Sequence, residues 1–377
     1  WPSERYVAMG RMQTGLYDVF SPAVMAESPV AADVYDDHIR TAQEAEQMGY
    51  EYYFSIEHQT SALSNLSAPN IYLTALARAT SVIRFGMMIY QLPFHQPIRL
   101  AQDTAMLDHM SRGRLEFGAG TGVSPHEFIR WNVPFEKRRK ISEEVLDIVL
   151  QAWTEQSVTY EGEFFQFIQV LTTPKPYQDP HPPIWFAAHS AASFEYAAKM
   201  NFSVSQNIDV DPVVAEKFAN WRKLWETHGH QGPAPKAFLT RHVHVAETDE
   251  LARAEAEPNL VMPREPDPEF DDSGRDAMAR AGMALGLDNR YADDEPTPEQ
   301  VELRRVFRER GQSYDFWVDN GIAIVGSPDT VIRKMKEQQE LVGHDVFCAQ
   351  HVFGHMPRDM VKKSIDLFGK EVLPAFQ

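Results

Sequence analysis

A glutamate–histidine pair is the first place in the sequence where acid–base chemistry is expected. Glu57 and His58 directly follow a short apolar run, residues 52–55, that is predicted to be a β-strand. Histidine is the usual proton donor or acceptor near neutral pH, and barrel active sites are built at the C-terminal ends of strands. His58 is therefore a candidate catalytic residue, with Glu57 as a partner that orients it or pairs with its charge. The alternatives are a structural histidine and an exposed loop acid.

A second candidate site lies where a predicted strand passes into a predicted helix. Residues 188–193, Ala-His-Ser-Ala-Ala-Ser, place Ser190 and Ser193 at the beginning of that helix. Hydroxyl groups and free backbone N–H groups at a helix N-terminus can bind a phosphate, although two serines there can also simply cap the helix. Arg139, in the basic run 137–140, is a candidate source of positive charge, and a solvated surface run is the alternative.

Two further patterns are open to more than one interpretation. Residues 118–122, Gly-Ala-Gly-Thr-Gly, follow a predicted strand, but the third glycine of the dinucleotide-binding fingerprint would fall on Val123. These glycines form either a tight turn or a place where a flat ligand approaches the backbone. His242 and His244 alternate on one face of another predicted strand, but no third ligand is near them in the sequence, so we expect no metal site.

The elements that must position these residues alternate between short apolar runs and longer helical patterns. Strands are predicted at 12–17, 52–55, 83–89, 115–117, 184–187, 202–205, 238–245, 322–325 and 346–352. Helices are predicted at 34–48, 71–80, 98–110, 143–153, 191–200, 331–341 and 360–372. Asp33 is the expected N-cap of the first helix, and Gly49 its C-terminal stop. This alternation predicts an α/β fold with a parallel sheet, and it leaves open whether the sheet closes into a barrel.

Two stretches interrupt the alternation. The runs 158–160 and 164–170 flank Glu-Gly-Glu at 161–163 and predict a β-hairpin outside the main repeat. From about residue 255 to residue 315 the chain is acidic, rich in proline and poorly periodic. We expect this segment to be an insertion in a single domain that spans residues 1–377. It is either a solvated surface loop or a mobile lid over the site.

The composition excludes several classes of protein. The chain has 377 residues, of which 43% are hydrophobic, enough for a sizeable core. A net charge of −18 argues against nucleic acids and anionic membranes as partners. The single cysteine, Cys348, allows no internal disulfide and fits a reducing compartment, so a cytoplasmic protein is expected. No apolar run is long enough for a transmembrane helix, and residues 1–5 lack the pattern of a signal peptide.

Several segments together resemble the bacterial luciferase-like monooxygenase family. The most specific is 107–122, which contains Leu-Asp-His-Met-Ser-Arg-Gly-Arg and the glycine-rich segment. The others are 52–58, 75–81 with 83–86, 182–185 with 187–190, 325–328, and 371–374. The resemblance covers nearly the whole chain except the acidic insertion. It implies an (α/β)₈ TIM barrel, and thus a closed sheet.

The resemblance also implies a cofactor and a chemistry. Monooxygenases of this family take reduced FMN from a separate NAD(P)H:flavin reductase and activate O2 as a flavin C4a-(hydro)peroxide. By this resemblance His58 is the catalytic histidine, and the acidic insertion is the mobile lid. The residues that hold the FMN phosphate would be Arg139, Ser190 and Ser193. Met88 and Ile89 would lie beside the isoalloxazine ring, where the family can have a cis peptide.

Four positions depart from luciferase itself. Gln59 stands in place of a second histidine, and Gly120 in place of a reactive cysteine, which argues against light emission from a long-chain aldehyde. Thr121 stands in place of a phosphate-binding arginine, and His189 in place of a glutamate. The cofactor-binding residues expected overall are Met88, Ile89, Gly120, Arg139, His189, Ser190 and Ser193.

We therefore predict a two-component flavin-dependent monooxygenase that acts on a small organic substrate, either apolar or carbonyl-containing. Its expected partners are reduced FMN, O2, a flavin reductase and a second copy of the chain in a homodimer. One alternative is a hydride-transfer enzyme of the same superfamily that uses a deazaflavin coenzyme. Another is a flavin-binding protein without catalytic activity, since a fold alone does not determine a function.

Overall fold

Eight parallel strands form a closed barrel in the computed structural model, which describes all residues except 1–10, 21, 60–65, 123–124, 208 and 261–312. The strands pair in chain order, and the last pairs with the first. They are β1 (Gln13–Asp18), β2 (Tyr52–Ser55), β3 (Arg84–Gln91), β4 (Leu115–Gly120), β7 (Ile184–Ala187), β8 (Ser203–Gln206), β9 (Ala237–Val245) and β11 (Val346–Gln350). The short strand β10 (Ala323–Gly326) pairs with the C-terminal part of β9. The expected TIM barrel is confirmed.

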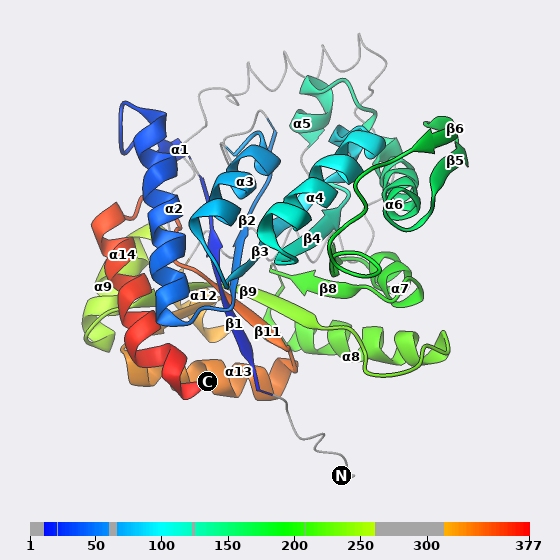
Figure 1. Ribbon diagram of the computed structural model, residues 1–377. Helices are drawn as coiled ribbons and strands as arrows, with labels where there is room; N and C mark the ends of the chain where they lie inside the picture. The colour runs from blue at the N-terminus through cyan, green and yellow to red at the C-terminus, as the bar shows by residue number, and fades with distance from the viewer. Residues whose placement is uncertain (1–10, 21, 60–65, 123–124, 208, 261–312) are drawn as a thin grey trace.

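Helices surround the barrel, as Figure 1 shows. Those that connect or follow barrel strands are α2 (Ala31–Met48), α3 (Pro69–Ala79), α4 (Pro97–Ser111), α6 (Arg138–Thr154), α7 (Ala191–Lys199), α8 (Asp211–Thr227), α9 (Asp249–Leu260), α13 (Pro328–Val342) and α14 (Arg358–Leu367). Shorter pieces are α1 (Pro22–Met25), α5 (Pro125–Arg130), α12 (Tyr314–Asp319), η1 (Leu92–Phe94), η2 (Phe135–Lys137), η3 (Phe368–Val372) and η4 (Leu373–Ala375). In the part of the chain that the structure describes, no helix is both long and apolar enough to cross a membrane.

Aromatic side chains fill the inside of the barrel. Phe54 on β2 meets Phe238 on β9 edge to face, with 5.3 Å between ring centroids, and Trp185 on β7 lies 5.8 Å from the same ring. The strands are buried almost throughout, because helices cover their outer side and these rings their inner side. This explains why the strands form nearly continuous apolar runs in the sequence.

The structure confirms the predicted end of α2 and the predicted hairpin, but not the predicted N-cap of α2. Gly49 does end α2, in a left-handed conformation with φ 94° that favours glycine. Asp33 is not the N-cap. The helix begins at Ala31, and the N-cap is Val30, whose side chain makes no capping hydrogen bond. The hairpin is confirmed as β5 (Ser157–Glu161) and β6 (Gln166–Leu171), a separate antiparallel pair beside α6.

Helices lie at both ends of the expected acidic insertion. Residues 255–260 belong to helix α9, which contains Pro258 near its end, and helix α12 begins at Tyr314. The rest of the insertion, and with it the hypothesis of a lid, lies outside the described residues.

Two buried histidines make the stability of the fold sensitive to acid. Burial, reinforced by the nearby arginines Arg241 and Arg222, lowers the pKa of His344 to about 3. Burial also lowers the pKa of His351 to about 3. In the unfolded chain a histidine takes up a proton below about pH 6.5. Since the folded protein does not, the stability is full above this pH and falls as the pH drops toward 3.

We expect this fall to amount to about 1.4 kcal/mol per pH unit for each of these histidines. His344→Gln should therefore flatten the curve of melting temperature against pH between about pH 6 and pH 4. His355→Gln, on the exposed loop before α14, is the matched control. Parallel curves for His344→Gln and the parent protein would contradict the prediction.

Candidate active site

Two adjoining cavities open at the C-terminal end of the barrel. The first, of about 220 Å³, lies above the aromatic interior and is bounded by Tyr17, Met88 and Phe238 below and by His58 and Gln91 at the side. The second, of about 380 Å³, lies between α6 and α7. Residues that line both cavities are Thr121, Gly122, Ala187 and His189. A ligand longer than either cavity can therefore occupy both.

The candidate catalytic histidine faces the first cavity. His58 follows β2 and is 7% exposed, and its Nδ1 lies 3.1 Å from each carboxylate oxygen of Glu127 on α5. Glu127 is fully buried and also accepts a hydrogen bond of 3.1 Å from the side-chain amide of Gln91. With Nδ1 engaged, Nε2 is the ring nitrogen that remains for a ligand.

The partner expected for His58 was wrong. Glu57 contacts His95 instead, with both carboxylate oxygens 3.0 Å from the imidazole Nε2. Although the two residues are adjacent in sequence, their side chains have different partners, Glu127 for His58 and His95 for Glu57. Burial alone would lower the pKa of His95, but the Glu57 carboxylate outweighs that effect and raises it.

The segment at the end of β3 lines the first cavity as well. The peptide bond between Met88 and Ile89 is cis, and the carbonyl oxygen of Met88 accepts a hydrogen bond of 2.7 Å from the Tyr17 hydroxyl. Gly120, on the neighbouring strand β4, lies behind Ile89, and a Cβ at this position would collide with the Ile89 side chain. The missing side chain of Gly120 thus leaves room for Ile89, while a direct contact between Gly120 and a cofactor stays a prediction.

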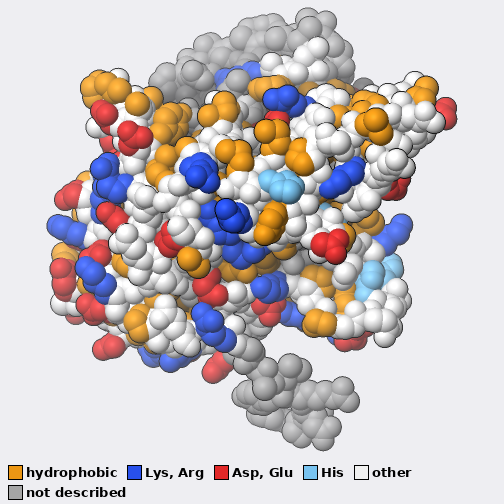
Figure 2. Space-filling model, viewed as in Figure 1, with side chains coloured by type: hydrophobic (Ala, Val, Ile, Leu, Met, Phe, Trp, Pro, Cys, Tyr) orange, Lys and Arg blue, Asp and Glu red, His pale blue; other side chains and the backbone are white. Residues whose placement is uncertain are grey.

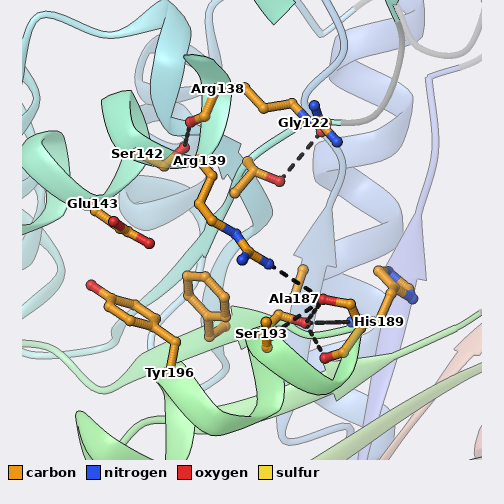
Figure 3. A pocket seen from close by; sticks show the side chains of 13 residues that line it. Gly122, Arg138, Arg139, Ser142, Glu143, Ala187, His189, Ser193 and Tyr196 are labelled. Atoms are coloured by element: carbon orange, nitrogen blue, oxygen red, sulfur yellow. Dashed lines mark hydrogen bonds between the residues drawn. The ribbon is translucent and has the colours of Figure 1, made fainter. Parts of the chain in front are cut away.

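The predicted phosphate-binding residues come together at the N-terminus of α7, as Figure 3 shows. Ser190 and Ser193 form a capping box, in which the Ser193 hydroxyl oxygen accepts the N–H groups of His189 and Ser190 at 3.0 Å each. The guanidinium of Arg139 on α6 donates to the Ser190 hydroxyl over 3.4 Å. The two serines therefore do cap the helix. They also present hydroxyl groups beside an arginine, a combination suited to an anion.

His189 lies where the two cavities meet. Its carbonyl oxygen accepts a hydrogen bond of 2.7 Å from the ammonium group of Lys217, which also pairs with Asp209 at 2.9 Å. Burial lowers the pKa of His189, with Asp209 opposing and Lys217 reinforcing the shift. The imidazole is therefore neutral near physiological pH.

Several side chains of the site were not predicted from the sequence. Glu127 is 69 residues from His58, and Lys217 is 28 residues from His189, so no local spacing links either pair. Gln91 belongs to no motif, although it lies only two residues beyond the predicted strand that contains Met88 and Ile89. A search of strand ends for polar residues would have found Gln91 but not the other two.

The pair of histidines on β9 has other partners. His244 Nε2 lies 2.7 Å from the Glu255 carboxylate, and the His242 ring packs against Trp317 and Phe353. Among the described residues, no group of three or more histidine, cysteine, aspartate or glutamate side chains could hold a metal ion.

Comparison with known proteins relates this chain to the luciferase-like monooxygenases. The family model of the luciferase-like monooxygenases matches residues 12–345. The oxygenase component of flavin-dependent trigonelline monooxygenase from Acinetobacter baylyi is 26% identical over 93% of this chain and 92% of its own length. Limonene 1,2-monooxygenase from Rhodococcus erythropolis is 26% identical over 89% of this chain and 79% of its own length. An uncharacterised protein, y4wF of Sinorhizobium fredii, is 27% identical over 53% of this chain and 58% of its own.

Solved structures share the fold. The oxygenating constituent of 3,6-diketocamphane monooxygenase from Pseudomonas putida, solved in complex with FMN, superposes with a TM-score of 0.71 at 22% identity. The match covers 97% of this chain and 98% of that one. The coenzyme F420-dependent tetrahydromethanopterin reductase from Methanopyrus kandleri superposes with a TM-score of 0.70 at 18% identity, over 98% of this chain and 100% of the other.

Proposed function

Because this chain belongs to the luciferase-like monooxygenase family, we propose that it is the oxygenase component of a two-component, flavin-dependent monooxygenase. It uses reduced FMN and O2 to oxygenate a small organic substrate. Reduced FMN, when bound, supplies the two electrons with which O2 delivers one oxygen atom to the substrate and the other to water. The cofactor therefore carries the redox chemistry, and the protein supplies binding, orientation and proton management.

The observation that carries this proposal is the pair of adjoining cavities with different linings. The cavity between α6 and α7 has Arg139, Ser190 and Ser193, which suit the phosphate of FMN. The cavity at the barrel mouth has Met88 and Ile89, which suit the flat ring system. Since the two cavities share lining residues, one FMN molecule can have its phosphate in the cavity between α6 and α7 and its ring in the cavity at the barrel mouth.

Two unpartnered polar atoms support the fit of a flavin ring. Gln91 Oε1 and Thr240 Oγ1 belong to residues that line the barrel-mouth cavity, and both atoms are buried without a hydrogen-bond partner among the described residues. Buried polar atoms of this kind cost stability unless a ligand or water pairs with them. The polar edge of an isoalloxazine ring has the donors and acceptors that could do so.

The protein's own residues have three tasks in this function. His58 holds or moves a proton at its Nε2 atom, which is free for a ligand. The apolar side chains of Tyr17, Ile56 and Phe238 exclude water from the reacting centre. The same side chains favour an apolar or carbonyl-containing substrate, in line with the substrate named for the limonene relative.

We also propose two protein partners. A separate NAD(P)H:flavin reductase supplies the reduced FMN, as the word "component" in the name of the trigonelline relative suggests. A second copy of the chain forms a homodimer. Exposed apolar side chains on α3 and α4 support this, since Ile71 is 76% exposed and Met106 51%, and Figure 2 shows hydrophobic side chains on this face. Light scattering after size-exclusion chromatography measures the oligomeric state.

The decisive experiment supplies chemically reduced FMN, and dioxygen labelled with the heavy oxygen isotope, to the purified protein. The substrates are limonene, trigonelline and a bicyclic diketone, taken from the relatives' names. Incorporation of one labelled oxygen atom into a product supports the proposal. Reduction of a substrate without O2 by a deazaflavin coenzyme would instead place the chain beside the F420-dependent reductase in function. Flavin binding with no product from any substrate in either assay would favour a carrier protein.

A further inference from the structure

Behind His58, two carboxylates and two glutamines form a crossed network of hydrogen bonds. The side-chain amide of Gln59 donates to Glu57 over 2.6 Å, while the backbone N–H of Gln59 donates to Glu127. Gln91 does the reverse, since its side-chain amide donates to Glu127 over 3.1 Å and its backbone N–H donates to Glu57 over 2.8 Å. Each glutamine thus connects both carboxylates, and each carboxylate also contacts one histidine.

This network removes the usual ambiguity about which atoms carry hydrogen. An ionised carboxylate only accepts hydrogen bonds, so the Gln91 amide must direct its NH₂ group toward Glu127. Its oxygen then points away from Glu127 and is buried without a hydrogen-bond partner among the described residues. The Gln91 amide nitrogen also lies 3.3 Å from His58 Nδ1, but both Glu127 oxygens lie closer, at 3.1 Å, so His58 carries its proton on Nδ1 to donate to Glu127, and Nε2 keeps a lone pair.

We propose that Glu127 is the positioning residue of His58. It holds the imidazole in the tautomer protonated at Nδ1, so that the acceptor which His58 presents to the cavity is Nε2. A ligand with N–H or O–H groups is therefore favoured over one that offers only acceptors. The catalytic part of this inference rests on the proposed function, whereas the tautomer and the role of Glu127 do not.

Gln59 links the two carboxylates of the network. This residue is buried, and it stands where luciferase has a histidine. As a glutamine it can donate from its backbone and its side chain to two different carboxylates at once. Glu127 itself lies on α5, a short helix with Phe128 packed against Phe94 and Phe135. This packing holds the carboxylate in place independently of His58.

The test is a ¹⁵N spectrum of the labelled histidines in the 377-residue protein without flavin, recorded over a range of pH values. Comparison with His58→Ala assigns the signal. In the parent protein we expect Nδ1 of His58 to carry the proton. In Glu127→Gln the new NH₂ group faces donors, so the preference for Nδ1–H should be lost and the Nε2–H tautomer should become populated. Glu127→Asp keeps a carboxylate and should retain Nδ1–H.

His95→Gln is the matched control, because His95 pairs with the other carboxylate, and the His58 signal should match the parent. An Nε2–H tautomer in the parent, or an unchanged tautomer in Glu127→Gln, would overturn the inference. Turnover with reduced FMN and O2 should fall at least about tenfold in Glu127→Gln and recover in part in Glu127→Asp. If Glu127→Gln turns over at the parent rate although the tautomer of His58 is altered, the catalytic part of the inference is overturned. Because the spectrum needs no flavin, it remains decisive even if the proposed monooxygenase activity is not found.

Discussion

Replacement of His58 by alanine is expected to lower single-turnover oxygenation by about 10²–10⁴-fold, the range for a general acid–base group. The reason is its position, since the imidazole lines the barrel-mouth cavity and its Nδ1 is held by a buried carboxylate. The flavin affinity should change little, because the phosphate is expected to bind at the other cavity. The measurements are the single-turnover rate, the Kd of reduced FMN and the melting temperature, all made on one preparation.

His38 provides a matched control for this prediction. It is also fully buried and pairs with a carboxylate, with Nδ1 2.6 Å from Asp18, but it lines neither cavity of the site. His38→Ala should therefore lower the melting temperature and leave the turnover per folded molecule near that of the parent. If His58→Ala behaves in this way instead, with lower stability and parent turnover, His58 is a structural residue and not a catalytic one.

The sequence predicts the position of His58 but not its partner. His58 follows closely after a predicted strand, and this position does lie at the barrel mouth. The partner could not be inferred, because nothing in the sequence near His58 indicates Glu127. The position of Glu57 next to His58 favoured Glu57 as the partner, but the carboxylate of Glu57 contacts His95.

Local sequence patterns predicted the helices and strands better than they predicted the closure of the sheet into a barrel. Parallel strands buried on both sides have the same apolar sequence in a barrel as in an open sheet. What distinguishes a barrel is the pairing of β1 with β11, for example Gln13 with Val346 at opposite ends of the chain. Only the family resemblance anticipated this pairing.

Helix α8 was not predicted, although the sequence contained the signal for it. Its buried residues Val214, Phe218, Trp221 and Trp225 follow a helical period.

Reduced FMN is expected to bind at least about 100-fold more tightly than reduced riboflavin, which lacks the phosphate. Charge-assisted hydrogen bonds contribute about 1.5–3 kcal/mol each, and two of them already account for this ratio. The donors would be the Arg139 guanidinium and the hydroxyl and N–H groups at the start of α7. Anaerobic titration of the protein with each flavin measures the two dissociation constants.

Arg139→Ala tests whether the expected preference for FMN over riboflavin comes from the site at the start of α7. Ser190 is a poor choice for the same purpose because it also caps α7, so its loss would lower the stability of the helix as well. Arg139 is exposed, and among the described residues its guanidinium donates one long hydrogen bond, to Ser190, so its removal should not disturb the fold. We expect about tenfold weaker binding of reduced FMN, equivalent to about 1.4 kcal/mol, with riboflavin binding unchanged.

Lys140→Ala is the control for a general effect of charge. Lys140 is adjacent in sequence, exposed and of the same sign, but it points to Glu163 on the hairpin side and does not line the cavity. If a diffuse positive field attracts the phosphate, both variants weaken FMN binding equally, and added salt removes the difference. If Arg139 contacts the phosphate, only Arg139→Ala weakens it. Equal dissociation constants of the parent protein for FMN and riboflavin would rule out a phosphate site at α7 altogether.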